Sequence, residues 1–380
     1  MFGLIILTIA LCASTMMTMR LIAPYPISFI YKMITAMIIF FMWSAPFLAN
    51  VRGREWNGFW VNLYTHAMYF LFVSAFLLFV ALLVRDLIWI LSYHLIPLLS
   101  KNFQNFSPFN LTALFWANVG TVVLVFILSG WALYNGIKIP EIEYLTISSD
   151  KIKEEKTIAV LSDLHLNRVL SLKKLQGIVD KTNALKPDII ILPGDIIDDD
   201  IIMLQEHLAI LKNLQAPMGI FASHGNHEFY VGLAQSSAAF RQLGFTELTK
   251  DGTSISPDLF IAGIPDNKSH ERFIHQKIHL EKALNKASLD QYIILLSHDP
   301  TFIHQVKRNQ IDLQISGHTH GGQIFPFHIL VWLGNKQLLS GLYKKDPALL
   351  YITRGAGQWG PQMRLGADSE ISLIKLIPIN

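Results

Sequence analysis

The first 135 residues of this 380-residue chain are almost free of charge. They contain six Lys or Arg and two acidic side chains, whereas the remainder carries 25 basic and 26 acidic ones. Apolar stretches of about 20 residues are long enough to cross the roughly 30 Å hydrocarbon core of a bilayer. Such stretches fold as helices, because every backbone polar group must be satisfied inside lipid. We therefore predict a membrane region of about four helices in residues 1–135.

Four apolar stretches mark the expected spans, at residues 2–23, 27–49, 59–84 and 111–134. The first could instead be a signal peptide, but no basic residue precedes Arg20, so an uncleaved anchor is favoured. Residues 85–110 are less apolar and richer in aromatic and amide side chains. We expect an interfacial helix and loop there, the alternative being the second half of a long third helix.

From residue 157 the pattern changes to short apolar runs that alternate with helical spacing. Strands are expected at 157–161, 189–192, 218–222, 259–263, 292–296 and 312–315, and helices at 172–185, 202–214, 233–243 and 273–287. This alternation predicts an α/β domain at 157–380. Residues 136–156 are interpreted as a linker, with a first strand of the domain as the alternative.

Polar side chains follow five of these strands at the point where each strand ends. The motifs are Asp163-Leu164-His165, Gly194-Asp195 with Asp198, Asn226-His227-Glu228, His298-Asp299, and Gly317-His318-Thr319-His320-Gly321. In open α/β sheets the ligand site lies at the carboxyl ends of the strands. Each motif alone would be an ordinary loop, but together they supply too many donors for one ion. They suit two ions about 3.5–4 Å apart.

Composition narrows the chemistry of this site. Cys12 is the single cysteine, so neither a disulfide framework nor a thiolate metal site is expected. Carboxylate, amide and imidazole donors fit two divalent ions, with Mn favoured and Fe or Zn as alternatives. No basic patch of the kind that binds nucleic acid is evident in the sequence.

The five motifs together resemble the calcineurin-like metallophosphoesterase superfamily over about residues 157–378. Segments 340–343, 353–355 and 363–365 also resemble its membrane-associated bacterial branch. The resemblance implies a two-sheet sandwich flanked by helices, following the α-helical transmembrane region. It assigns one metal to Asp163, His165 and His320, the other to Asn226, His298 and His318, a bridging role to Asp195 and a catalytic role to His227.

Three further polar residues are given roles beside the metals. Asp198 is expected to orient a ligand, or else to belong to a solvated acidic run with Asp199 and Asp200. Arg354 and Arg364 are candidates for binding a second phosphate of the substrate. The alternative for both arginines is a surface salt bridge.

The membrane region and the apolar segment 325–333 suggest a lipid substrate. That segment is either an apolar lip that dips into the interface or a core-packing loop. Since some members of the resembled branch cleave the pyrophosphate of UDP-2,3-diacylglucosamine in lipid A biosynthesis, that bond is the expected target. The alternatives are an anchored generic phosphodiesterase and a membrane sensor with a phosphoesterase output.

The expected location is the bacterial inner membrane, as a multi-pass protein. The basic residues near the spans do not decide the orientation. We expect the catalytic domain on the cytoplasmic side, because a UDP-linked substrate is made there. The expected partners are the bilayer and a phosphorylated lipid or nucleotide-lipid, without nucleic acid or an obligate protein partner.

Overall fold

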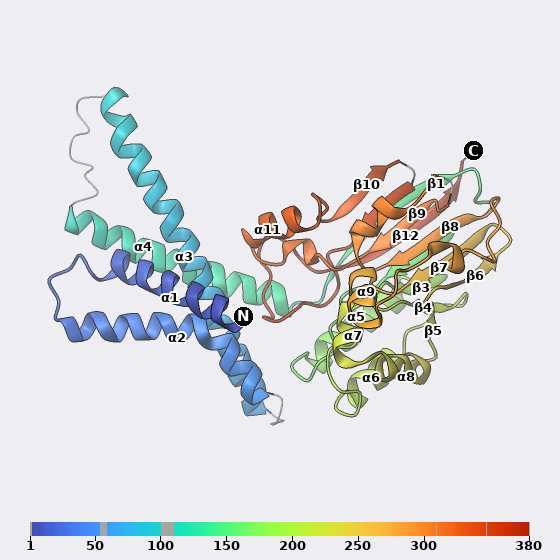
Figure 1. Cartoon of the computed structure of the whole chain (residues 1–380), viewed down its shortest axis with the longest axis horizontal. Coiled ribbons are helices and arrows are strands. Elements are labelled where there is room, and N and C mark those ends of the chain that lie inside the picture. Colours follow the sequence, from blue (N-terminus) through green and yellow to red (C-terminus); the bar gives the residue numbers. More distant parts are fainter. Residues whose placement is uncertain (1, 54–58, 100–109, 309, 347, 380) are drawn as a thin grey trace. The chain divides into compact units, whose positions relative to one another are not determined.

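The computed structural model describes residues 2–53, 59–99, 110–308, 310–346 and 348–379 (Figure 1). The chain divides into two compact units. The membrane unit is Met1–Tyr134 with Gly360–Met363, and the catalytic unit is Asn135–Trp359 with Arg364–Asn380.

Four helices make up the N-terminal region: α1 (Phe2–Leu21), α2 (Phe29–Gly53), α3 (Phe59–Leu99) and α4 (Leu111–Ile137). Three contain stretches long and apolar enough to cross a membrane, at Phe29–Leu48, Trp60–Leu95 and Leu111–Ile137. Helix α1 is 20 residues long and apolar as well, and Leu7–Leu21 is its apolar stretch among the residues searched. Four helices therefore lie where about four were expected, and the number of them that cross a membrane stays a prediction.

Helix α3 is 41 residues long and continues well past the span expected from the sequence. Residues 85–99 belong to it, so the interpretation of that part as a separate interfacial helix and loop is wrong; residues 100–109 lie outside the described residues. No glycine or proline interrupts the chain between residue 59 and residue 96. The charge at Asp86 is paired with Arg20 at 2.9 Å and with Arg85 at 2.5 Å, which lets it lie within the helix.

The catalytic unit is built on two six-stranded sheets. Sheet one has the order β1 (Glu141–Ser149), β12 (Glu370–Pro378), β2 (Lys156–Val160), β3 (Ile189–Leu192), β4 (Ile220–Ala222) and β5 (Thr246–Glu247). Sheet two has the order β10 (Gly341–Lys345), β11 (Ala348–Ile352), β9 (Leu313–Ser316), β8 (Tyr292–Ser297), β7 (Leu259–Ile264) and β6 (Asp251–Ser256). The two-sheet α/β fold that the resemblance implied is confirmed.

Most neighbouring strands in the catalytic unit are parallel. The antiparallel pairs are β12 with β2, β6 with β7, and β10 with β11. Strands β2, β3 and β4 run parallel in sheet one, and β7, β8, β9 and β11 run parallel in sheet two. Parallel neighbours end at the same edge of their sheet, so the loops that follow them lie together.

The apolar runs of the strands are buried on both faces. Ile189 and Ile191 of β3 pack in the core between the sheets, together with Ile294 of β8. Ile190 and Leu192 point the other way, into a core shared with the helices outside sheet one. Side chains alternate between the two faces of a strand, so a strand covered on both sides is apolar throughout.

Short helices complete the catalytic unit. They are α5 (Leu172–Ala184), α6 (Gln205–Leu211), α7 (Asn226–Val231), α8 (Leu233–Leu243), α9 (Asn267–Ile274), α10 (Leu280–Ala283) and α11 (Phe327–Gly334), with 3-10 turns η2 (Pro300–Gln305) and η3 (His320–Gly322). Residues of α5, α6 and α8 join the core outside sheet one. The helix expected at 273–287 is wrong, because α9 ends at His275 in the left-handed conformation with φ 58°.

The segment interpreted as a linker contains a nine-residue strand, which was the alternative expectation. Residues 141–149 form β1, which pairs in parallel with β12 from Glu141 opposite Glu370 to Ser149 opposite Pro378. Only Lys138, Ile139 and Pro140 separate the end of α4 from the start of β1. The partner strand lies more than 200 residues away along the chain, so no local pattern indicated this pairing.

Candidate metal centre

Five predicted ligands have a positive φ angle, a backbone conformation that residues other than glycine rarely adopt. The φ angles are 54° at Asp163, 47° at His165, 52° at Asp195, 72° at His318 and 49° at His320. Left-handed residues other than glycine are uncommon and gather at functional sites, where the surrounding fold holds them. Each follows a strand, β2, β3 or β9, so the turn after the strand aims its side chain back over the sheet edge.

Two glycines allow the loops to meet. A Cβ at Gly317 would lie 2.1 Å from Oδ2 of Asp163, and a Cβ at Gly225 would lie 2.2 Å from Oδ1 of Asp195. Both distances are far inside van der Waals contact, so any side chain would push the carboxylates away. The backbone N–H of His318 instead donates to Asp163 at 3.0 Å, and that of His227 donates to Asp195 at 2.9 Å.

Six of the seven predicted ligands, all but Asn226, gather with the predicted catalytic His227 into three overlapping groups. Each group has its ligand atoms within 4.8 Å of one another: Asp163, His165 and His320; His165, Asp195 and His227; Asp195, His298 and His318. Oδ2 of Asp195 lies 3.1 Å from Nε2 of His298 and 3.7 Å from Nε2 of His165. Asp195 therefore stands between the two sides of the site, where a bridging carboxylate would be needed.

Several buried atoms at the centre make no hydrogen bond among the described residues, namely Nδ1 of His165, Oδ1 of Asn226 and Nε2 of His298. Leaving such atoms unsatisfied costs about 1–3 kcal/mol each. A cation would satisfy the lone pairs of Asn226 and His298. The carboxylate, amide and imidazole donors, without thiolate, fit divalent ions. The residues present therefore suit the divalent metals of this fold.

His227 is held by Asp198. Nδ1 of His227 donates a hydrogen bond to Oδ1 of Asp198, whose other oxygen lies 3.4 Å from Nδ1 of His165. Burial alone would lower the pKa of His227, but the bond to Asp198 and the charges of Asp195 and Asp198 raise it to about 9. Burial likewise opposes ionisation of Asp198, and the two histidines overcome it and lower the pKa of Asp198 to about 2. Asp198 thus orients His227 and lies near His165, while Asp199 pairs with Arg168.

Glu228 has a structural role that the sequence did not reveal. It is fully buried, and its Oε1 accepts from the backbone N–H groups of Ile196 at 2.7 Å and Ile197 at 2.9 Å. Its Oε2 accepts from Asp195 at 3.0 Å and from Gly225 at 2.7 Å. One carboxylate therefore fastens the loop after β3 to the loop after β4. The only sequence signal was its place directly after Asn226 and His227.

The two arginines expected near a second phosphate have other partners. Arg364 is fully buried and donates to the carbonyl oxygens of Ala367 at 2.9 Å, Arg354 at 2.9 Å and Gly357 at 2.5 Å. Its Nη2 also lies 3.4 Å from Nδ1 of His320. Arg354 pairs with Glu370 at 2.5 Å and donates to the carbonyl of Asp368 at 3.0 Å. Arg364 is thus placed to orient His320, and Arg354 forms the ion pair that was the alternative expectation.

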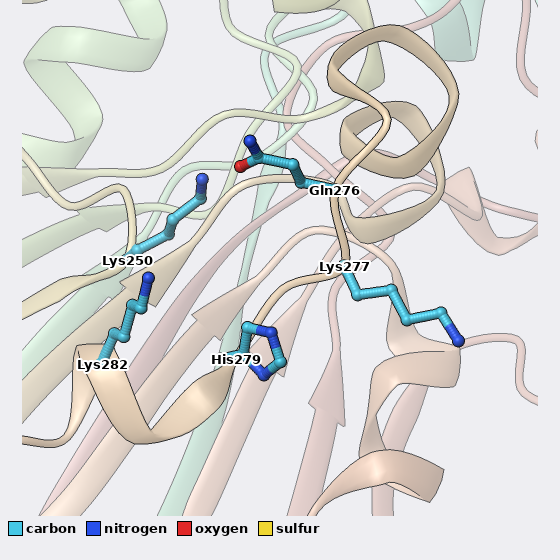
Figure 2. A pocket seen from close by; sticks show the side chains of 5 residues that line it. All are labelled: Lys250, Gln276, Lys277, His279 and Lys282. Carbon is cyan, nitrogen blue, oxygen red and sulfur yellow. The ribbon is translucent and has the colours of Figure 1, made fainter.

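A separate hollow of about 240 Å³ lies in the catalytic unit, lined by Lys250, Gln276, Lys277, His279 and Lys282 (Figure 2). It shares no residue with the metal centre. Figure 2 shows Lys250 and Lys282 on one side of it and the end of Lys277 directed away. Surface lysines alone do not define a ligand, so the metal centre remains the candidate functional site.

Comparison with known proteins agrees with this geometry. A family model described as calcineurin-like phosphoesterase matches residues 156–322. An uncharacterized metallophosphoesterase from Aquifex aeolicus is 32% identical over 62% of this chain and 91% of its own length. The chain therefore belongs to the calcineurin-like phosphoesterase family, and its C-terminal domain is that of a metal-dependent phosphoester hydrolase.

For two further relatives, the match to this chain covers a smaller share of the relative's length. An uncharacterized metallophosphoesterase from Helicobacter pylori is 34% identical over 65% of this chain and 66% of that protein. A Danio rerio protein named as a transmembrane protein with a metallophosphoesterase domain is 30% identical over 69% of this chain and 63% of that protein. The chain thus spans about two thirds of the length of these two proteins.

Proposed function

We propose that this protein hydrolyses a phosphodiester or pyrophosphate bond in a lipid of its own membrane. The specific candidate is the pyrophosphate of UDP-2,3-diacylglucosamine, a step of lipid A biosynthesis. The observation that carries the hydrolase proposal is Oδ2 of Asp195, placed between Nε2 of His298 at 3.1 Å and Nε2 of His165 at 3.7 Å. A carboxylate between two groups of imidazoles suits a pair of divalent ions, for which we favour Mn.

The residues of the site divide the chemistry between them. Two divalent ions, when bound, neutralise phosphoryl oxygens and lower the pKa of a water molecule. Asp195 holds its place because Glu228 fixes the backbone of its loop. Burial opposes protonation of His227, but its hydrogen bond to Asp198 and the charges of Asp195 and Asp198 raise its pKa to about 9. His227 is therefore able to stabilise negative charge on the phosphoryl group or to protonate the leaving oxygen.

The chain's own connectivity supports a substrate in the membrane. Three helices are long and apolar enough to cross a bilayer, and the third of them ends three residues before β1. More spans are present than anchoring alone requires. The Danio rerio relative is also named as a transmembrane protein. We place the protein in the bacterial inner membrane with the catalytic unit on the cytoplasmic side, where UDP-linked substrates are made.

The test compares substrates on the purified full-length protein in one detergent with saturating Mn. Release of UMP from UDP-2,3-diacylglucosamine is measured beside hydrolysis of bis-nitrophenyl phosphate. We expect kcat/KM for the nucleotide-lipid to be at least about a hundredfold higher, a difference of about 2.7 kcal/mol in transition-state binding. Equal values would make the protein a generic anchored phosphodiesterase. Loss of both activities in Asp195→Ala is the control for contaminating hydrolases.

A further inference from the structure

Helix α11 is unlike the other α-helices of the catalytic unit. None of its eight residues is buried, and Phe327, Leu330 and Leu333 are 43%, 61% and 58% exposed. Each of the helices α5 to α10 buries at least two residues. Figure 1 shows that α11 does not lie over the face of either sheet. The interpretation of this segment as a core-packing loop is therefore wrong.

The chain contacts the turn that carries His318 and His320 both at the start of α11 and a few residues beyond its end. At its start, the N–H of Phe327 donates to the carbonyl of Ile324 at 2.8 Å, and a Cβ on Gly322 would lie 2.1 Å from Cβ of His328. Beyond its end, Oγ1 of Thr319 donates to the carbonyl of Leu339 at 2.5 Å. Thr319 stands between the two histidines, so α11 is linked to the histidine turn at its start and through the segment that follows it.

The sequence around α11 carries more lysines than acids. Residues 321–346 contain Lys336, Lys344 and Lys345 and one acidic residue, Asp346. Lys336 and Lys345 act on the same neighbour, because burial and then these two charges lower the pKa of His304. Both charges are therefore within electrostatic reach of His304. An exposed apolar helix beside lysines is the composition of a segment that lies in the interface of an anionic membrane.

The catalytic unit follows α4 after a very short connection. Helix α4, which is long and apolar enough to cross a bilayer, ends at Ile137, and β1 begins at Glu141. The three residues between them reach at most about 11 Å when fully extended. A bilayer crossed by α4 is therefore the apolar partner that the chain itself brings, whereas any other would have to be recruited.

We propose that α11 docks into the interfacial layer of the same bilayer that α2, α3 and α4 cross. Its apolar side chains lie below the headgroups, and Lys336, Lys344 and Lys345 lie against anionic lipid phosphates. Because α11 is linked to the histidine turn, docking holds the metal centre at headgroup level, where the phosphoester of a lipid lies. This consequence for substrate class rests on the proposed function, whereas the docking itself is independent of turnover.

The test uses full-length protein in nanodiscs that contain an anionic phospholipid. In a Cys12→Ser background, a single cysteine is introduced by Leu330→Cys and labelled with a fluorophore that reports a nonpolar environment. The matched control is Leu289→Cys, an equally apolar and even more exposed position, at 74%, outside α11. Lipids with a nitroxide on the acyl chain should quench the label at residue 330 about twofold or more and leave the label at residue 289 unchanged.

Each outcome of this test either supports or overturns the docking of α11 on the bilayer. Quenching that weakens in a Lys336→Gln, Lys344→Gln, Lys345→Gln variant supports docking on anionic lipid. Equal, weak quenching at residues 330 and 289 overturns it. A crosslinked dimer through Leu330→Cys without quenching would assign α11 to a second copy of the chain and likewise overturn it.

The docking of α11 and the proposed substrate can be refuted independently of each other. Quenching is measured without substrate, and hydrolysis of a soluble diester reports on the metal centre alone. If quenching is present but the nucleotide-lipid is not hydrolysed, docking stands and the proposed substrate falls. If the nucleotide-lipid is hydrolysed without quenching, the substrate stands and the docking of α11 falls.

Discussion

Asp198 and His227 form a hydrogen-bonded pair at the edge of the metal centre. The carboxylate accepts from Nδ1, which leaves Nε2 of His227 facing Asp195 at a distance of 3.9 Å. Nδ1 therefore orients the imidazole ring, and Nε2 is left to act on the substrate. This division of roles leads to the first prediction.

Replacing His227 with alanine should lower kcat by roughly 10²–10⁴, the usual effect of losing a general acid. Metal content should stay the same, because Asp195, His165 and His298 remain. Asp198→Asn keeps the shape but removes the charge, so its effect should be smaller, about 10–100-fold. Metal content is measured by elemental analysis beside kcat. Stoichiometric loss of metal in His227→Ala would make His227 a ligand instead.

Asp195→Ala should abolish metal-dependent hydrolysis even at saturating Mn. Asp195 belongs to two of the groups of ligand atoms, so its loss weakens both sides of the centre. Insertion into the membrane should be unaffected, since the spans lie in a separate unit. Membrane fractionation and activity are measured on the same preparation. Full activity in this variant would refute the two-metal assignment.

Arg364→Lys should reduce metal affinity about 10–100-fold, because it removes a partner that orients His320. A lysine has one ammonium group in place of the planar guanidinium fork, so it cannot bond the same set of carbonyl oxygens. Arg354→Lys, at an ion pair that is partly exposed, is the matched control and should change metal affinity little. Mn affinity is measured by titration of metal-free protein. A raised KM for the pyrophosphate substrate with normal Mn affinity would return Arg364 to the substrate site.

Turnover of the lipid should depend on the length of its acyl chains. Each methylene buried in the bilayer contributes about 0.8 kcal/mol, so affinity should rise steeply from short-chain to long-chain substrates. Leu333→Asp should weaken lipid hydrolysis and leave a soluble nitrophenyl diester nearly unaffected. Equal kcat/KM for short and long chains would remove the lipid substrate.

Buried Lys174 should make the stability of the folded protein depend on pH. Burial, with the charge of Arg364, lowers its pKa from about 10.5 to about 7. The unfolded chain therefore binds more protons between these two values, and this group makes the free energy of unfolding rise with pH across that window. The rise is at most about 1.4 kcal/mol per pH unit. Denaturant unfolding at pH 7, 8 and 9 should show a smaller rise in Lys174→Met, and identical slopes would contradict the shift.

The site was predictable to the extent that its signals are local. A strand followed at once by Asp163 and His165, or by His318 and His320, is visible in the sequence, and parallel strands bring such ends together. What the sequence could not show is which backbone groups the loops use to hold one another. Glu228 directly follows His227 in the sequence. The four hydrogen bonds that its carboxylate accepts nevertheless join loops that follow two different strands.

The sequence by itself determined the apolar membrane region, the alternating strands and helices, and the five motifs, because each is written in residues close together in the chain. Tertiary structure decided the rest. The pairing of β1 with β12 joins segments more than 200 residues apart, and the burial of Arg364 depends on carbonyl oxygens that only the folded loops bring together. The exposure of α11 is likewise decided by the fold, because the sequence of an apolar helix does not show whether another element covers it.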